Sequence, residues 1–302
     1  MVCGVDPATV SAVAERARTE NFPVASLLFP RAVRPHLRAI YGFARLVDIL
    51  GDEYDGDRPA ALDELEREVE ACYSYEPGRR STRSGPATQT DAWAEPMRPE
   101  SGTASGAEPA WEVMRVLQPT IRACALPREP FLRLIEANRI DQRISTYETW
   151  ADVKHYCVHS ADPVGRLVLG VLGRTEPELV ALSDDVCTGL QLVNFLQDVP
   201  RDLALGRVYM PADDLRRFGV TELAAPNEPL RRLLDFEAAR ARGLLGSGEE
   251  LGRRLGRRTG RGVAIFARGG LAALEALERA DWDIFNGRPR PSRARLALAA
   301  IR

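Results

Sequence analysis

The chain has 302 residues, of which 45% are hydrophobic and 28% charged, and its formal net charge is −2. This ordinary apolar fraction with so small a net charge excludes an intrinsically disordered chain. Dedicated nucleic-acid binders are basic overall, so no nucleic acid is expected as a partner. No apolar run reaches the roughly 18 residues of a membrane span, and the N-terminal stretch turns charged too early for a secretory signal. We therefore expect a cytoplasmic protein.

Most of the chain shows the spacing of amphipathic helices, with apolar residues three and four positions apart. Alanine, leucine, arginine and glutamate dominate these segments, and no segment alternates like a strand. An all-α fold is therefore expected. In chain order, the predicted helices span residues 6–19, 31–52, 59–75, 110–124, 128–143, 149–158, 161–173, 176–204, 228–256 and 261–285.

Residues 74–109 interrupt the helical pattern, because they are rich in proline, glycine, serine and threonine and show almost no periodicity. We interpret them as a flexible surface insertion that joins two helices of a single domain covering residues 1–302. A linker between two domains is the alternative. The segment before it has only about 73 residues, which favours the insertion.

The predicted helix 31–52 carries a polar stripe on an otherwise apolar surface. Its members, spaced four, three and four residues apart on one helical face, are Tyr41, Arg45, Asp48 and Asp52. Two carboxylates one turn apart repel each other, and burying such a stripe is costly unless its charges are paired or bind an ion. A divalent cation between the two aspartates would remove this conflict.

A second stripe lies on the predicted helix 176–204, where Asn194, Asp198 and Asp202 step by four residues. Gln197 and Arg201 lie on the adjoining face. A single DxxxD pattern is common and usually belongs to a solvated helix face. Two such sets on mostly apolar helices, each accompanied by arginine, instead favour carboxylates that face each other across an apolar cavity. Such a cavity suits Mg²⁺, which prefers oxygen ligands and bridges to substrate phosphates.

These motifs resemble the squalene and phytoene synthases, which couple prenyl diphosphates head to head. The resemblance covers nearly the whole chain and is carried by ENFPVASLLFPRAVRPHLRAIYGFARLVDILGDE, LIEANRIDQRISTYETWADVKHYCVHSADPVGRLVL, QLVNFLQDVPRDLALGRVYMP and FARGGLAALEALERADWDIFNGRPRPS. The ENFPVAS opening is similar to the hydroxysqualene synthase branch, the second enzyme of a bacterial three-enzyme route to squalene. The resemblance implies a single-domain class I isoprenoid synthase fold, with helices around a central apolar cavity.

The resemblance also implies roles for individual residues. Asp48 and Asp52 would form the first Mg²⁺ site, and Asn194, Asp198 and Asp202 the second, for roughly two or three ions in all. The implied diphosphate-binding residues are Tyr41, Arg45, Asn194, Gln197, Arg201, Arg207 and Tyr209. The implied catalytic residues are Asp48, Asp52, Asp198, Asp202 and Tyr156. Asp141, in EANRID, matches a further family position whose role the sequence leaves open.

The chain departs from the family pattern at Ile49, and a proline that the family tolerates lies between the second pair of aspartates. The hydroxysqualene synthase branch typically has VDDIGDE where this chain has VDILGDE, so Ile49 replaces an expected aspartate. Because the DxxxD pair is retained, we expect metal binding to be retained as well. Pro200 lies between Asp198 and Asp202 and removes one helical hydrogen bond, which predicts a kink that aims the two carboxylates.

The implied reaction is the Mg²⁺-dependent loss of diphosphate from presqualene diphosphate, followed by rearrangement of the carbocation and its capture by water to give hydroxysqualene. Mg²⁺ and Arg45 would neutralise the charge that develops on the leaving diphosphate. The sequence Gly246-Ser-Gly248 follows no predicted strand and is a weak dinucleotide signal, so no NADPH is expected. Functional coupling to a presqualene diphosphate synthase is a further expectation.

Three alternative functions remain open. The chain could couple two prenyl diphosphates to presqualene diphosphate, squalene or phytoene. The change at Ile49 would also permit a catalytically degenerate homologue that acts as a partner subunit. A lipid carrier, the third alternative, would bind isoprenoids without Mg²⁺.

Peripheral contact with the inner membrane face is a separate hypothesis. It depends on an arginine run that is more typical of a solvated helix end. The run consists of Arg253, Arg254, Arg257, Arg258 and Arg261.

Overall fold

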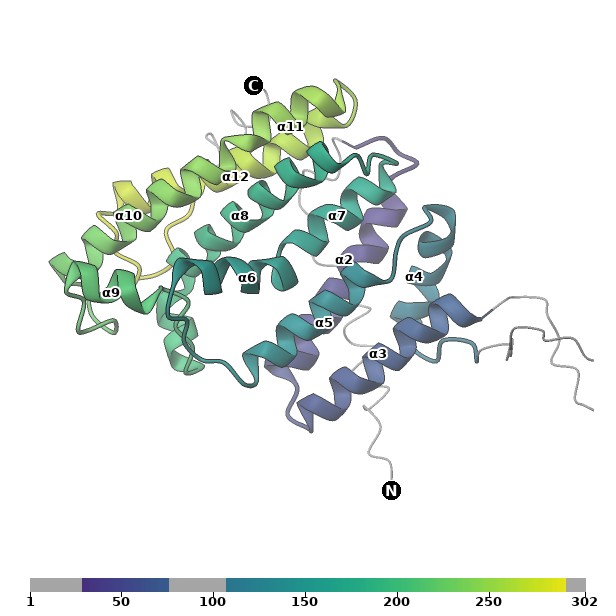
Figure 1. The fold of residues 1–302 in the computed structure, drawn as a ribbon, viewed down its shortest axis with the longest axis horizontal. Helices are drawn as coiled ribbons and strands as arrows, with labels where there is room; N and C mark the ends of the chain where they lie inside the picture. The colour runs from purple at the N-terminus through teal and green to yellow at the C-terminus, as the bar shows by residue number, and fades with distance from the viewer. Residues whose placement is uncertain (1–28, 76–106, 292–302) are drawn as a thin grey trace, which may run out of the picture.

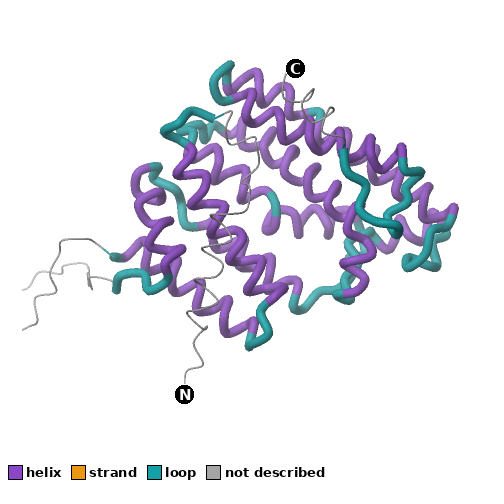
Figure 2. Tube along the Cα trace, turned by 180° about the vertical axis from the view of Figure 1, so that it is seen from behind, coloured by secondary structure: helices purple, strands orange, loops and turns teal. Residues whose placement is uncertain are grey.

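Helices form almost all the regular structure in the residues that the computed structural model describes, 29–75 and 107–291 (Figure 1). In these ranges there is no strand, only an isolated bridge between Thr146 and Val208 (Figure 2). The all-α prediction is confirmed. The helices are α2 (Arg34–Asp48), η2 (Ile49–Glu53), α3 (Arg58–Ser74), α4 (Glu112–Ala123), α5 (Glu129–Asp141), α6 (Trp150–Ser160), α7 (Asp162–Val171), α8 (Pro177–Ala204), α9 (Ala212–Phe218), α10 (Glu228–Leu245), α11 (Ser247–Leu255) and α12 (Gly260–Arg279).

The predicted helices differ from the observed ones mainly near the C-terminal end. The segment 228–256 forms two helices that meet at Gly246. The last helix ends at Arg279 rather than 285, because Asp281 and Trp282 have positive φ angles, which end helical geometry. The short α9 was not predicted. The predicted helix 6–19, and the part of the predicted insertion between 76 and 106, lie outside the described residues.

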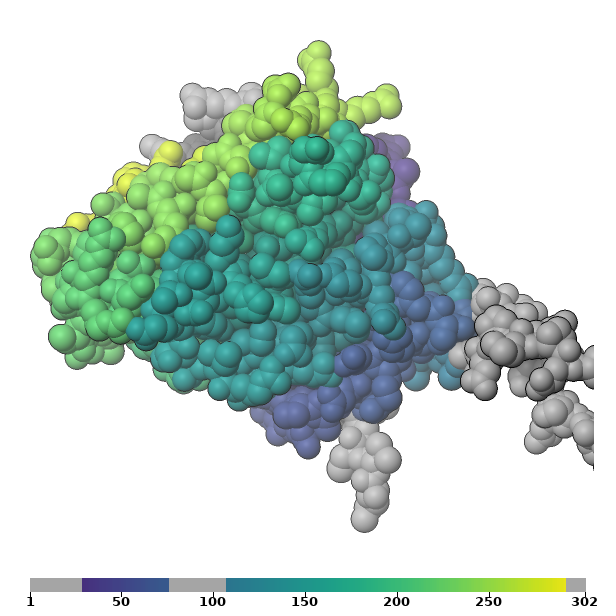
Figure 3. Space-filling model, in the orientation of Figure 1, coloured from purple at the N-terminus to yellow at the C-terminus, as the bar shows by residue number. Residues whose placement is uncertain are grey.

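Buried side chains form two apolar clusters, one built around α8, α10 and α12 and the other around α2, α3, α4 and α5. Val171, in α7, packs against both clusters. Figure 3 shows the same order on the surface: α10 and α12 lie at one end, α3 at the other, and α5 to α7 between them. The long helix α8 runs between α10 and α6 (Figure 1).

Helix α8 continues through Pro200 as one helix. By length and hydropathy α8 could cross a membrane, with a mean hydropathy of 1.3 over its best window. Half of that window is buried inside the protein, which is also the behaviour of a core helix. Packing inside the helical bundle therefore accounts for the apolar character of α8.

Helix α2 changes into the π-helix η2 where the first acidic motif begins. The N–H of Tyr54 donates to the carbonyl oxygen of Ile49, five residues earlier, at 2.9 Å. Single π-turns inside α-helices are rare and frequently occur at functional sites. Asp48 is the last residue of α2 and Asp52 lies within η2, so the DxxxD spacing spans the change of helix type.

Candidate active site

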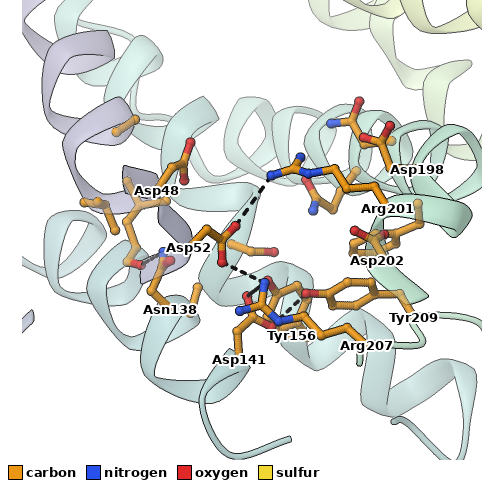
Figure 4. Close-up of a pocket in the computed structure, with 18 of the residues that line it drawn as sticks. Asp48, Asp52, Asn138, Asp141, Tyr156, Asp198, Arg201, Asp202, Arg207 and Tyr209 are labelled. Atoms are coloured by element: carbon orange, nitrogen blue, oxygen red, sulfur yellow. Dashed lines mark hydrogen bonds and ion pairs between the residues drawn. The ribbon is translucent and has the colours of Figure 1, made fainter. Parts of the chain in front are cut away.

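A cavity of about 360 Å³ lies where α2, η2, α5 and α8 meet. Residues of both acidic motifs line it, although the motifs are about 150 residues apart in the chain. In Figure 4, Asp48 and Asp52 lie on one side, and Asp198, Arg201 and Asp202 lie on the other. The predicted site residues that line the cavity are Arg45, Asp48, Asp52, Tyr156, Asn194, Asp198, Arg201, Asp202, Arg207 and Tyr209.

Two predicted diphosphate-binding residues, Tyr41 and Gln197, are not among those that line the cavity. Tyr41 lies one turn before Arg45 on α2. Gln197 is buried, and its side-chain amide donates to the carbonyl oxygen of Pro289 at 3.0 Å. Its side-chain oxygen accepts a hydrogen bond from Arg288 at 2.9 Å. Gln197 therefore holds the segment that follows α12, and its position gives no support to direct diphosphate binding.

Enclosure, together with repulsion from the other carboxylate of the motif, disfavours the charged forms of Asp48 and Asp202. Enclosure by the cavity wall raises the pKa of Asp48 to about 7, and repulsion by Asp52 contributes in the same direction, although part of the Asp48 side chain is exposed in the cavity. Burial, followed by repulsion from Asp198, raises the pKa of Asp202 to about 7. Each motif thus holds two carboxylates whose repulsion a bound cation would reduce.

Arginines contact the aspartates from several elements. Arg207, in the segment after α8, is bonded to Asp52 at 2.7 Å and its side chain is only 10% exposed. Arg201 lies 3.9 Å from the other oxygen of Asp52. Arg288 lies 3.5 Å from Asp198 and donates to Asn194 at 3.3 Å. These guanidinium groups bring positive charge to the edge of the acidic cavity.

Asp141, at the end of α5, forms the centre of a hydrogen-bonded cluster in the cavity wall. Tyr156 donates to its Oδ2 at 2.7 Å, and Tyr209 donates to its Oδ1 at 2.8 Å. Arg207 lies 4.0 Å from Oδ2. Burial raises the pKa of Asp141 above its usual value, against the opposing effects of the tyrosines and the arginine. Phe195 stacks on the ring of Tyr209, with centroids 4.1 Å apart.

The cavity is more polar than the central apolar cavity that the resemblance implies. Its apolar lining, as far as the described residues form it, consists of Ala44, Val47, Leu134, Ala137, Val164 and Phe195. The physical reason is that α5 contributes Asn138 and Asp141 to the same wall as the two acidic stripes. The predicted helical fold around a central cavity is confirmed, and these six residues form the apolar part of the lining of that cavity.

Sequence reasoning missed Asn138 and Arg288, which both line the cavity. Asn138 precedes Asp141 by three residues on α5, so the helical spacing of these two polar residues was an available signal. A Cβ atom on Gly51 would lie only 1.7 Å from Oδ1 of Asn138, so the glycine allows η2 to approach α5 closely. Arg288 lies in the FNGRPRPS segment, which carries part of the resemblance but has no polar pattern that predicts a role.

The residues present fit a Mg²⁺–diphosphate complex better than a metal site made of protein ligands alone. Within the described residues, no group of three or more His, Cys, Asp or Glu side chains is placed to hold a metal ion. Mg²⁺ does not require such a group, because it is commonly bound by one or two carboxylates, by water and by substrate phosphates. The pairs Asp48–Asp52 and Asp198–Asp202, both of which line the cavity, fit that mode of binding.

Comparison with known proteins shows which family and which relatives the chain is similar to. Residues 16–295 match the model of the squalene/phytoene synthase family. The hydroxysqualene synthase of Rhodopseudomonas palustris is 34% identical over 242 residues, covering 78% of this chain and 70% of the relative. That of Zymomonas mobilis is 31% identical over 236 residues, covering 75% of this chain and 67% of the relative.

Solved structures of squalene and dehydrosqualene synthases have the same fold as this chain. The squalene synthase HpnC of Alicyclobacillus acidocaldarius is 40% identical, with a TM-score of 0.73, and the match covers 91% of this chain and 97% of that one. A dehydrosqualene synthase solved with a ligand is 21% identical and has a TM-score of 0.77 over 98% of this chain and 97% of that one. At that identity the second match shows the fold alone.

Proposed function

The chain belongs to the squalene/phytoene synthase family and is a prenyl diphosphate-processing synthase, and we propose that it converts presqualene diphosphate to hydroxysqualene with Mg²⁺. The convergence of two aspartate pairs on one cavity carries the proposal for diphosphate chemistry. The choice of reaction is supported by the relatives, since hydroxysqualene synthases are 31–34% identical and two presqualene diphosphate synthases are 26–27% identical.

In this proposal the acidic residues hold the metal and the arginines hold the diphosphate. Asp48 and Asp52 would bind Mg²⁺ from one side, and Asp198 and Asp202, with Asn194, from the other. Bound Mg²⁺ supplies charge stabilisation for the leaving diphosphate. Arg201, Arg207 and Arg288 lie next to these carboxylates and can donate to diphosphate oxygens, because a planar guanidinium group can donate two parallel hydrogen bonds to a phosphate.

The same wall offers an environment for the hydrocarbon part of the substrate. Val47, Leu134, Val164 and Phe195 line the cavity beside the polar groups. Apolar and aromatic side chains exclude bulk water and protect a carbocation until it has rearranged. The reaction proposed here ends with water rather than hydride, so it requires no NADPH. It would take place in the cytoplasm, with substrate supplied by a presqualene diphosphate synthase.

Product analysis tests the proposal. The purified protein is incubated with Mg²⁺ and either presqualene diphosphate or farnesyl diphosphate, and the products are identified by mass spectrometry. We expect hydroxysqualene from presqualene diphosphate and no product from farnesyl diphosphate alone. Addition of a chelator should stop diphosphate release, and the Asp198→Asn variant serves as the site control.

A coupling reaction is the second candidate, because presqualene diphosphate synthases and phytoene synthases are also among the relatives. Conversion of farnesyl diphosphate to presqualene diphosphate, without hydroxysqualene from the second substrate, would replace the proposal by this candidate. Binding of either substrate without any turnover, by folded protein with Mg²⁺, would instead favour a degenerate homologue or a carrier.

A further inference from the structure

Asp141 has an environment that suits a reacting water molecule. Its side chain is only 7% exposed, yet it lines the cavity. Tyr209 donates to Oδ1 and Tyr156 donates to Oδ2, and Arg207 lies nearer to Oδ2. A carboxylate oxygen can accept two hydrogen bonds. Among the described residues, Oδ1 receives one hydrogen bond, so it can accept another from a water molecule in the cavity.

We propose that Asp141 is the catalytic residue that binds the water molecule ending the reaction and accepts its proton, with Tyr156 and Tyr209 as the residues that position its carboxylate. This inference rests on the proposed function, because only a reaction that ends in an alcohol requires such a water. Figure 4 shows Asp141, Tyr156, Arg207 and Tyr209 grouped on one side of the four aspartates of the acidic motifs.

The location of Asp141 relative to the diphosphate site supports this role. Arg207 contacts Asp52 at 2.7 Å and lies 4.0 Å from Asp141, so one buried guanidinium connects the two sites. A carbocation that forms when the diphosphate leaves is therefore generated near Asp141. The rings of Phe195 and Tyr209 are stacked at 4.1 Å, and the rings of Tyr156 and Tyr209 are 5.3 Å apart. Such aromatic faces attract a cation.

The hydrogen bonds of Asp141 also explain why water, and not the carboxylate, would attack the cation. Two tyrosine hydroxyls and a nearby guanidinium withdraw electron density from the carboxylate oxygens, which lowers their nucleophilicity. A water molecule that donates to Oδ1 keeps its own lone pair directed away from Asp141. The water is thus held as the nucleophile, and the carboxylate is held as a base.

The step balances without any further reactant. The leaving diphosphate takes the electron pair of its C–O bond, which leaves the carbocation. A lone pair of the water oxygen forms the new C–O bond, one O–H bond breaks, and the proton passes to Asp141. Burial raises the pKa of this carboxyl group, which favours acceptance of a proton. No oxidation or reduction occurs.

Product ratios of four variants, measured with presqualene diphosphate and Mg²⁺, test this role. Asp141→Asn cannot accept the proton, so the cation should lose a proton elsewhere and give hydrocarbons in place of the alcohol. We expect the alcohol-to-hydrocarbon ratio to fall by at least about fivefold, the effect of one lost hydrogen bond of ordinary strength. Tyr156→Phe and Tyr209→Phe should lower the ratio less, because each removes one of the two bonds that hold the carboxylate.

Tyr147 provides a matched control in the same aromatic cluster. Its ring packs against Tyr156 and Tyr209, with centroids 5.6 and 5.8 Å apart. Its buried hydroxyl has no hydrogen-bond partner among the described residues. Tyr147→Phe should therefore leave the product ratio unchanged. Diphosphate release is measured separately, because a purely structural defect would slow release without changing the ratio.

The outcomes separate this inference from the proposed function. An unchanged alcohol share in Asp141→Asn, with diphosphate still released, would overturn the assignment and point to the leaving diphosphate as the base. If Asp141→Asn does not fold, unchanged ratios in both tyrosine variants would overturn it equally. If the unaltered protein makes no hydroxysqualene but couples farnesyl diphosphate, the proposed function itself has failed. In H₂¹⁸O, the alcohol of the unaltered protein should carry the label.

Discussion

Glu237, a buried glutamate away from the active site, provides a quantitative test of how burial changes the pH dependence of stability in this fold. Its side chain, on α10, is completely buried, and Arg240 donates to both of its oxygens at 2.8 and 2.7 Å. Arg240 is shared with Asp214 of α9, at 3.1 Å, and its guanidinium lies over the ring of Trp150. Burial raises the pKa of Glu237 from 4.5 to about 7, although Arg240 opposes this shift. Below about pH 7, the protonated form of Glu237 is therefore favoured in the folded protein.

The effect of pH on stability follows from this pKa. Because the folded protein holds a proton on Glu237 that the unfolded chain releases above about pH 4.5, the contribution of Glu237 to stability is greatest below that pH and falls as the pH rises through 7. A tenfold change in an equilibrium is worth about 1.4 kcal/mol, so the shift corresponds to about 3 kcal/mol. Glu237→Gln removes the titrating group, so the variant should lose stability more slowly than the unaltered protein between pH 4 and pH 8.

Thermal unfolding of both proteins at pH 5 and pH 8 measures the effect. The difference in Tm between the two pH values should shrink by about 5 °C in Glu237→Gln, since 1 kcal/mol shifts Tm by about 2 °C in a chain of this size. Asp235→Asn, an exposed position on the same helix, should leave the difference unchanged. Equal pH dependence of the unaltered protein and Glu237→Gln would refute the argument from burial.

Three further predictions concern other parts of the chain. Gly51→Ala should destabilise the fold by about 1–3 kcal/mol, measured by denaturant unfolding, because its Cβ would meet Asn138; adding Asn138→Ala should restore part of the loss. Asp198→Asn should slow diphosphate release by about 100-fold, measured in a phosphate-coupled assay, with Tm nearly unchanged. Arg257→Gln combined with Arg258→Gln should weaken sedimentation with vesicles containing phosphatidylglycerol, by about 1 kcal/mol per arginine, but not with phosphatidylcholine vesicles. Equal sedimentation of both proteins would contradict the membrane hypothesis.

The acidic motifs were predictable from the sequence because helical spacing determines which side chains share a face. Asp48 and Asp52, and Asp198 and Asp202, were expected to converge on one cavity, and they line the same one. Helical spacing does not predict, however, which groups each side chain contacts. Gln197 lies on the face adjoining Asp198, and the resemblance implies that it binds diphosphate. Its side chain instead bonds to the segment after α12.

Features that depend on tertiary packing could not be predicted in this way. Arg288 reaches Asn194 of α8 through the segment after α12, where Asp281 and Trp282 adopt positive φ angles; aspartate tolerates this conformation, but tryptophan gives no sign of it in the sequence. The change from α2 to η2 has no periodicity signal either, because one π-turn alters a single repeat. The short α9 spans only seven residues, too few for a helical pattern to be distinguished.

The position of Ile49 shows why the departure from the family motif does not argue for a degenerate enzyme. Ile49 follows Asp48 directly, is 5% exposed within the apolar cluster of α2, α3, α4 and α5, and is not among the residues that line the cavity. An aspartate at this point would place a carboxylate among apolar side chains, where a charge is strongly disfavoured. The isoleucine therefore contributes to packing beneath the site, while Asp48 and Asp52 still face the cavity. We accordingly expect Ile49→Asp to lower Tm and to leave the affinity for Mg²⁺ unimproved, and tighter Mg²⁺ binding by that variant in calorimetric titration would contradict this reasoning.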